Sequence, residues 1–323
     1  MTDMRYTTLG DSGLVVSVVG LGCNNLGRDG TQTIDLDGSK AVVEAAIDAG
    51  ITLFDVADIY GGAGRSEELL GQSLAGHRDD VIVATKFGMD MRGANGPDWG
   101  ARGSRRYIRR AVESSLRRLE TDYIDLYQYH APDRMTPIEE TLAALSELVD
   151  EGKVRYLGSS NFAGWQVVEA DFLARSSGSP RFISAQNNYN LLERGVEAEL
   201  SPACEAYGVG ILPFFPLANG LLTGKYARGA DAPAGTRLAT KSAVLQNADW
   251  DVLEGLNSFA KERGISMLDV AIGGLGAQPA VSSVIAGATK PEQVRANAAT
   301  ARWEPSAEDL VALDEIVPTP RRR

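Results

Sequence analysis

Short apolar runs and longer segments with helical spacing alternate along most of the chain. From Asp37 to Ala49 the apolar residues recur every three or four positions, which is typical of a helix with one buried face, and Gly50 is well placed to end it. The next residues, Ile51–Phe54, form a short β-prone run, which is typical of a buried strand. The same alternation predicts eight strands, at 18–22, 51–54, 81–85, 123–127, 154–158, 182–186, 210–213 and 281–285.

Helices are predicted between these strands and after the last of them. The expected helices are 37–49, 66–74, 104–119, 136–150, one beginning after Asn161, 195–207, 249–263, 266–278, 291–300 and 306–316. Strands and helices that alternate with no linker between them favour one parallel sheet covered by helices. We therefore expect a single domain over residues 1–323, an α/β fold of the (β/α)8 or TIM barrel type.

Three segments depart from this rhythm. The residues 10–13, Gly-Asp-Ser-Gly, lie between two β-prone runs at 6–9 and 14–17, so we expect an N-terminal β-hairpin that closes the bottom of the barrel. Two long loops, 87–102 and 218–241, contain several glycines and show no periodicity. Loops of this length inside a compact domain are usually functional, so we expect both on the active face.

Reactive side chains follow three neighbouring strands at the points where the apolar runs end. Asp55 ends the second strand, with Tyr60 five residues later; Lys86 ends the third, and His130 follows the fourth. The carboxyl ends of barrel strands form the active face, so these four side chains are expected to converge there. Taken singly, each has a simpler interpretation: a capping carboxylate, a strand-end ammonium, a half-buried phenol or a histidine that caps a strand.

The sequence around these residues is specific enough to indicate a family. Together with Gly158–Phe162, Phe215–Leu217, Gly224–Tyr226 and the late segment 287–297, the set Asp55, Tyr60, Lys86 and His130 resembles the catalytic tetrad of the aldo-keto reductases, in the family's order over nearly the whole chain. The resemblance implies that Tyr60 is the general acid and base, and that Lys86 lowers the pKa of the phenol while Asp55 holds the lysine. It also implies that His130 orients and polarises the substrate carbonyl.

The cofactor is indicated by the family resemblance and by the lack of a Rossmann fingerprint after the first strand. After the first strand the chain reads Gly20-Leu21-Gly22-Cys23-Asn24-Asn25, which is no Gly-x-Gly-x-x-Gly fingerprint, so a Rossmann domain is disfavoured. The resemblance implies NADPH or NADP+, extended across the barrel top, with the adenosine 2′-phosphate near Thr289 and Lys290. The residues expected to bind it are Gly22, Ser160, Asn161, Gln186, Phe214, Leu217, Asn219, Gly220, Lys225, Arg237, Gly287, Thr289, Lys290, Gln293 and Asn297.

The substrate pocket is harder to place. Cys23, Asn25, Phe87 and Trp99 lie next to strand ends or in the first long loop, and each is a candidate for lining an apolar cleft or, equally, for packing. The expected substrate is a small molecule with an aldehyde or ketone group. Two alternatives stay open: a non-catalytic NADP(H)-binding sensor or accessory protein of the same fold, and a phosphate-binding aldolase or isomerase barrel.

Composition and charge limit the kinds of partner and the cellular location that we expect for the protein. The formal charge of −11 argues against nucleic acid or an anionic membrane as partner, and 44% hydrophobic residues in a chain of 323 can build a large core. Cys23 and Cys204 are too few for a disulfide framework, there is no signal-peptide pattern, and no apolar run reaches membrane-spanning length, so we expect a cytoplasmic protein without a structural metal. The oligomeric state is left open.

Overall fold

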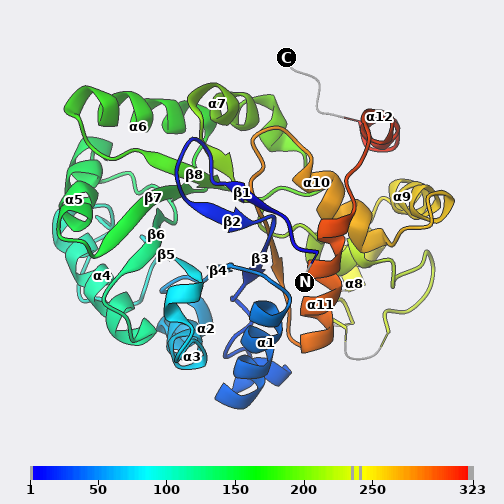
Figure 1. Cartoon of the computed structure of the whole chain (residues 1–323), viewed down its shortest axis with the longest axis horizontal. Helices are drawn as coiled ribbons and strands as arrows, with labels where there is room; N and C mark the ends of the chain where they lie inside the picture. The colour runs from blue at the N-terminus through cyan, green and yellow to red at the C-terminus, as the bar shows by residue number, and fades with distance from the viewer. Residues whose placement is uncertain (1–2, 234–235, 240–241, 319–323) are drawn as a thin grey trace.

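A parallel sheet that closes on itself forms the centre of the computed structural model, which describes residues 3–233, 236–239 and 242–318 (Figure 1). The strand order is β10-β3-β4-β5-β6-β7-β8-β9. Ile211 in β9 pairs with Val281, and the Ile285 amide donates to the Pro213 carbonyl at 3.0 Å, so the two edges meet. The predicted (β/α)8 barrel is confirmed. The barrel strands are β3 (Val19–Gly22), β4 (Leu53–Asp55), β5 (Ile82–Phe87), β6 (Ile124–Tyr129), β7 (Val154–Ser160), β8 (Phe182–Gln186), β9 (Gly210–Ile211) and β10 (Val284–Gly287).

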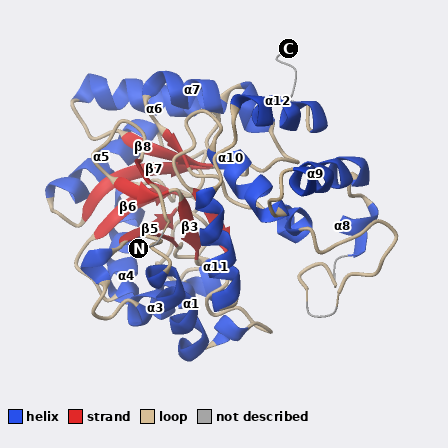
Figure 2. Ribbon diagram, turned by 45° about the vertical axis from the view of Figure 1, so that its right-hand side comes forward, coloured by secondary structure: helices blue, strands red, loops and turns tan. Residues whose placement is uncertain are grey.

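Helices surround the barrel, with α8, α9 and α12 gathered on one side of it (Figures 1 and 2). Most of the hydrophobic core lies between the outer surface of the sheet and the helices that surround the barrel. The α-helices are α1 (Leu36–Asp48), α2 (Tyr60–Ala63), α3 (Arg65–Ser73), α4 (Arg105–Leu119), α5 (Ile138–Asp150), α6 (Gly164–Ser177), α7 (Leu200–Tyr207), α8 (Ser242–Gln246), α9 (Trp250–Glu262), α10 (Gly274–Gly276), α11 (Pro291–Ala299) and α12 (Ala307–Ile316). None of the helices that the structure describes is long and apolar enough to cross a membrane.

One predicted helix is broken in the structure, and another continues through a π-helical turn. The segment 195–207 is a short 3-10 turn (η3, Gly195–Ala198) followed by α7, because Glu199 leaves the helical conformation at φ −138°. The Glu199 carboxylate accepts the backbone N–H of Trp165 at 2.9 Å and so caps the start of α6. The segment 266–278 contains a π-helical turn (η5, Asp269–Gly273) before the short α10. The second long loop, 218–241, begins with the 3-10 helix η4 (Ala218–Thr223).

The N-terminal hairpin closes the bottom of the barrel as expected. Strands β1 (Tyr6–Thr8) and β2 (Val15–Ser17) pair antiparallel, and the hairpin side chains Leu9, Leu14 and Val16 pack into the barrel interior. Gly10 has φ +57°, and a Cβ there would lie 2.5 Å from the Gly208 carbonyl oxygen, so only glycine fits. The hairpin is therefore fitted to the lower rim, away from the carboxyl ends of the strands.

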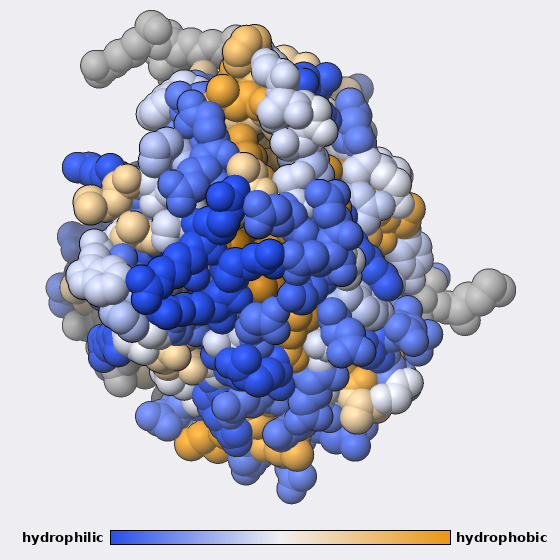
Figure 3. Space-filling model, turned by 90° about the vertical axis from the view of Figure 1, so that its left-hand side faces the viewer, coloured by the Kyte–Doolittle hydropathy of each residue, from blue (hydrophilic) through white to orange (hydrophobic). Residues whose placement is uncertain are grey.

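The outer face formed by α4 and α5 is largely hydrophilic (Figure 3). Arg105 on α4 pairs with Glu147 on α5 at 3.0 Å, and Arg109 pairs with Glu151. Such exposed pairs contribute little to stability individually, about 0–1 kcal/mol each. This face is an ordinary solvated surface, and the chemistry lies at the barrel top.

Candidate active site

The four predicted catalytic side chains meet at the carboxyl ends of β4, β5 and β6. The Lys86 ammonium donates to Asp55 Oδ2 at 2.7 Å, to the Val56 carbonyl at 2.8 Å and to the Tyr60 hydroxyl at 3.5 Å. These contacts use all three ammonium protons. The Tyr60 and His130 rings stand edge to face, with centroids 5.9 Å apart. The structure therefore brings together all four residues that the sequence singled out.

Asp55 and Lys86 form an ion pair inside the barrel. The Lys86 side chain is 0% exposed and that of Asp55 is 4% exposed. Asp55 Oδ1 accepts from Gln186 Nε2 at 2.7 Å and from Gln128 Nε2 at 3.1 Å, so both carboxylate oxygens are hydrogen-bonded. Burial alone would lower the pKa of Lys86, but the charge of Asp55 and the contact with Tyr60 outweigh burial and raise it. Lys86 is therefore a permanent cation at neutral pH.

The expected lowering of the Tyr60 pKa is not found. Burial raises the pKa of the phenol, and the Lys86 charge, which lowers it, only partly compensates because Asp55 opposes it. At neutral pH Tyr60 is therefore a protonated phenol that can donate. The prediction weighed the Lys86 charge but not the burial of the phenol, which is the largest cause of the raised pKa and to which Asp55 adds.

His130 is neutral in this site. Burial, followed by the repulsion of Lys86, lowers its pKa to about 3. Its Nδ1 has no hydrogen-bond partner among the residues that the structure describes, so the ring offers a free polar group inside the site. The His130 carbonyl accepts from Asn161 Nδ2 at 2.9 Å, which ties the histidine to the end of β7. Asn161 adopts the left-handed φ of +58° that asparagine tolerates.

The expected nicotinamide-binding residues lie next to the ion pair. Ser160 Oγ accepts from Asn161 Nδ2 at 3.1 Å, and the Gln186 amide nitrogen contacts Asp55 and Gln128. Sequence reasoning missed Gln128 and Asn187, whose buried Oδ1 has no partner among the described residues. Gln128 could have been found, because an amide in the apolar run of β6 lies on the same strand face as His130.

The expected phosphate-binding loop turns sharply beside the site. Asn219 and Gly220 have left-handed φ values of +59° and +103°, and a Cβ on Gly220 would lie 3.6 Å from Lys225 Nζ. Just before this turn, the Phe214 amide donates to the Asn187 carbonyl at 3.0 Å, and Leu217 is the residue before η4. The loop thus brings backbone groups and the Lys225 charge to one place.

Arg28 is a cation at this rim that sequence reasoning missed. Its Nη1 donates to Asn25 Oδ1 at 3.1 Å, and Asn25 Nδ2 donates to the Ala288 carbonyl at 3.3 Å. Burial and the charge of Arg28 both lower the pKa of Arg237, whose buried Nε has no partner among the described residues. Two guanidinium groups that repel each other suit an anionic ligand.

The late segment presents a helix N-terminus at the same rim. Gly287 pairs with Gly22 across β10 and β3, and Lys290 is the residue before α11, which has Pro291 at its first position. The Thr289 amide donates to Gln293 Oε1 at 2.8 Å, whereas Lys290 is half exposed and Asn297 is buried.

Two of the four expected pocket residues do not line a cleft. Cys23 and Phe87 are 0% exposed, and Phe87 stacks on Tyr129 with centroids 5.0 Å apart. Phe87 points into the layer between sheet and helices, because Lys86 beside it points into the barrel. Asn25 is buried but polar contacts hold it at the rim, and Trp99 is 72% exposed in its loop.

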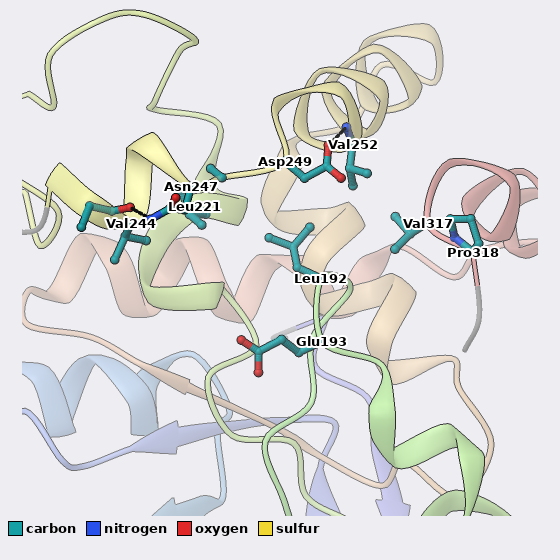
Figure 4. A pocket seen from close by; sticks show the side chains of 11 residues that line it. Leu192, Glu193, Leu221, Val244, Asn247, Asp249, Val252, Val317 and Pro318 are labelled. Atoms are coloured by element: carbon teal, nitrogen blue, oxygen red, sulfur yellow. Dashed lines mark hydrogen bonds between the residues drawn. The ribbon is translucent and has the colours of Figure 1, made fainter. Parts of the chain in front are cut away.

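A cavity in the described part of the chain lies away from the tetrad. Its volume is about 670 Å³, and Leu192, Val252 and Val317 point toward one space in it (Figure 4). It lies among η4, α8, α9 and the end of α12, and no tetrad residue lines it.

No group of three or more candidate metal ligands occurs among the described residues.

A TIM barrel with a buried Lys–Asp pair, a tyrosine and a histidine at its carboxyl rim defines a class of oxidoreductase. A model of the aldo/keto reductase family matches residues 18–318, and the chain belongs to this family. It is 39% identical over 304 residues to a probable voltage-gated potassium channel subunit beta of Oryza sativa subsp. japonica, covering 91% of this chain and 90% of that one.

Two bacterial relatives match over almost their full length. The chain is 37% identical over 326 residues to the uncharacterized oxidoreductase YrpG of Bacillus subtilis, covering 98% of this chain and 97% of that protein. It is 35% identical over 330 residues to the L-glyceraldehyde 3-phosphate reductase of Escherichia coli, covering 97% and 92%. The chain is therefore similar both to reductases and to a protein named as a channel subunit.

Proposed function

We propose that the protein reduces aldehydes or ketones to alcohols with NADPH, and that Tyr60 is the general acid. The observation that carries the proposal is the position of the Lys86 ammonium, which contacts both the Asp55 carboxylate and, at 3.5 Å, the Tyr60 hydroxyl. When bound, the cofactor supplies the hydride that adds to the carbonyl carbon. The oxygen of the substrate then becomes an alkoxide, which must take up a proton.

Tyr60 donates that proton. A buried phenol with a raised pKa is a weak acid in water, but an alkoxide is a much stronger base than a phenolate, so the transfer runs downhill. The phenolate that remains lies next to the Lys86 ammonium, which stabilises it at the moment it forms. Neutral His130 donates a ring N–H to the substrate oxygen and orients it, as its low pKa permits.

The residues present suit a dinucleotide. Amide and hydroxyl groups of Ser160, Asn161 and Gln186 gather beside the ion pair, and the buried Oδ1 of Asn187 is an unused acceptor for a carboxamide. The cations Lys225, Arg237 and Arg28 would hold the pyrophosphate. Lys290 and Thr289, before the N-terminus of α11, would hold the 2′-phosphate, which underlies the preference for NADPH over NADH.

The experiment that tests this function is a fluorescence titration with NADPH and NADH, followed by a panel of aldehydes and ketones. We expect tighter binding of NADPH and turnover of at least one carbonyl class. Failure to bind either nucleotide would contradict the proposal. The chain is proposed to act in the cytoplasm on small molecules, which its net charge and its two buried free cysteines support.

A second candidate function is nucleotide sensing as an accessory subunit. The observation in its favour is the 39% identity to a relative named as a probable potassium channel subunit beta. NADPH binding without measurable reduction of any carbonyl on the panel would favour it. The hydrogen bonds that join Asp55, Lys86 and Tyr60, with the His130 ring beside Tyr60, support the reductase instead.

A further inference from the structure

Asp58 is a carboxyl group inside the protein that the proposed chemistry does not use. It lies between Asp55 and Tyr60, and its side chain is 0% exposed. Its backbone N–H donates to the Lys86 carbonyl at 3.2 Å, and its Oδ2 accepts from Asn95 Nδ2 at 3.3 Å. Asn95 belongs to the long loop 88–104 between β5 and α4. One carboxyl group therefore joins the segment that carries Tyr60 to this loop.

The loop has a buried inner part and an exposed outer part. Met91 and Asn95 are 2% and 4% exposed, whereas Trp99 is 72% exposed. Asn95 Nδ2 also lies 3.4 Å from the Tyr107 hydroxyl on α4, and that hydroxyl donates to the Met89 carbonyl at 3.4 Å. The contacts of Asp58, Asn95 and Tyr107 thus hold the inner part of the loop against the barrel.

No cation pairs with Asp58 in the described structure. The guanidinium of Arg118, whose charge acts on Asp58, is bound to Glu67 at 2.7 Å, and Glu67 also accepts from Thr85 Oγ1 at 2.5 Å. The groups that face Asp58 are Glu67 on α3, Arg118 and Tyr107 on α4, Tyr127 on β6 and Asn95 in the loop. Their net charge is zero because Glu67 and Arg118 compensate each other.

The burial of Asp58 and the lack of a paired cation in the described structure favour a neutral acid, although two N–H groups donate to its carboxyl group. Asp58 Oδ1, Asn95 Oδ1 and the Tyr127 hydroxyl are buried, and none has a partner among the described residues. A buried carboxylate with one bare oxygen is costly, whereas a carboxylic acid carries a proton that it can donate to a neighbouring oxygen. Burial and then the negative charge of Glu67 raise the pKa of Asp58 well above its usual value, although Arg118 and the hydrogen bonds from the Ile59 amide and from Asn95 oppose the shift.

We propose that Asp58 is a positioning residue, a carboxylic acid kept neutral, which with Asn95 fixes the inner part of the loop 88–104 against the segment that carries Tyr60. The consequence for catalysis rests on the proposed reductase function: a loosened loop should raise KM for the carbonyl substrate more than it lowers kcat. The structural consequences do not depend on that function. They can be measured on a protein that shows no turnover.

The first test is the pH dependence of the stability of Asp58→Asn. When folding raises the pKa of a carboxyl group, the protein loses stability as pH rises from the pKa of that group in the unfolded chain, about 3.9, toward its pKa in the folded protein. The uncharged asparagine escapes this loss. The stability of the variant relative to the wild type should therefore rise with pH. The ratio of the two unfolding equilibrium constants, measured by urea denaturation between pH 4 and 8, should shift in favour of the variant by up to about tenfold per pH unit.

Asp90→Asn is the matched control. Asp90 lies in the same loop, is exposed and pairs with Arg102 at 3.3 Å, so its loss should change the unfolding constant by no more than about fivefold, with no comparable growth as pH rises. If Asp58→Asn were instead less stable than the wild type throughout, with a deficit that grows at higher pH, Asp58 would be an ionised member of a salt bridge. That result overturns the proposal.

The second test breaks the contact from the loop side. Asn95→Ala removes the donor without touching the Tyr60 segment, and loss of a buried hydrogen bond should speed trypsin cleavage after Arg92 or Arg102 on the order of tenfold. Asp58→Asn keeps an acceptor oxygen and should be cleaved no faster than the wild type. Unchanged cleavage of folded Asn95→Ala would show that the contact does not hold the loop.

Discussion

Replacing Lys86 by methionine tests the ion pair at the centre of the site. The side chains are similar in length, but the change removes the only hydrogen-bond donor to Asp55 Oδ2 in the described structure and leaves a carboxylate that is 4% exposed. Breaking a buried pair by removing one partner costs about 3–5 kcal/mol. Gln128 and Gln186 still donate to Oδ1, which favours the lower end of that range. Urea denaturation at pH 7 measures the loss, and carbonyl reduction should fall with it.

The double variant Lys86→Met, Asp55→Asn separates electrostatics from packing. An asparagine needs no cation, so the double variant should recover at least about 1 kcal/mol of the loss while remaining inactive. The deficit of the single variant should also shrink as pH falls, because a proton then neutralises the stranded carboxylate. A double variant that is no more stable than Lys86→Met would refute the view that the stranded charge of Asp55 causes the loss.

Four further predictions address single groups. Tyr60→Phe keeps the ring and should lower carbonyl reduction by a factor on the order of 10² or more with NADPH affinity unchanged; near-normal turnover would rule out Tyr60 as the acid. Lys290→Ala should weaken NADPH but not NADH in fluorescence titrations, and an equal fall for both would remove Lys290 from the 2′-phosphate. Arg28→Gln should weaken both nucleotides and reduce the salt dependence of binding, whereas unchanged affinity would place Arg28 outside the site. His130→Gln should gain stability relative to the wild type as pH falls below 6.5, because the buried neutral histidine has a pKa of about 3; parallel stability curves would contradict this.

Much of the barrel could be predicted because each buried strand is a short apolar run with a polar residue at its end. The predicted strand at 182–186 matches β8, and the runs before Asp55 and Lys86 match β4 and β5 within two residues. The helix 195–207 could not be predicted as broken, because the break depends on Glu199 capping a different helix, α6. Contacts between distant segments of this kind leave no mark in a local pattern.

The tetrad was predicted from the strand ends together with the family resemblance, but its electrostatics could not be predicted. That Lys86 lies near Tyr60 could be expected from the sequence, whereas the sign of the Tyr60 pKa shift depends on how deeply the phenol is buried and on how much of the lysine charge Asp55 offsets. Both are properties of the packed site. The buried acid Asp58 could not be predicted for the same reason, since a carboxyl group three residues after Asp55 suggests nothing by itself.

The alternation of side chains along β5 and β6 could have placed two residues, Phe87 and Gln128, correctly. In β5 the residues Ala84 and Lys86 face the barrel interior, so Thr85 and Phe87 must face the helices, and Phe87 indeed stacks on Tyr129 outside the barrel. Applied to β6, the same rule puts Gln128 on the inner face with Leu126, next to Asp55, where it is found at 3.1 Å. The sequence therefore contained the reason to exclude Phe87 from the cleft and to include Gln128 in the site, once Lys86 fixed which face was inside.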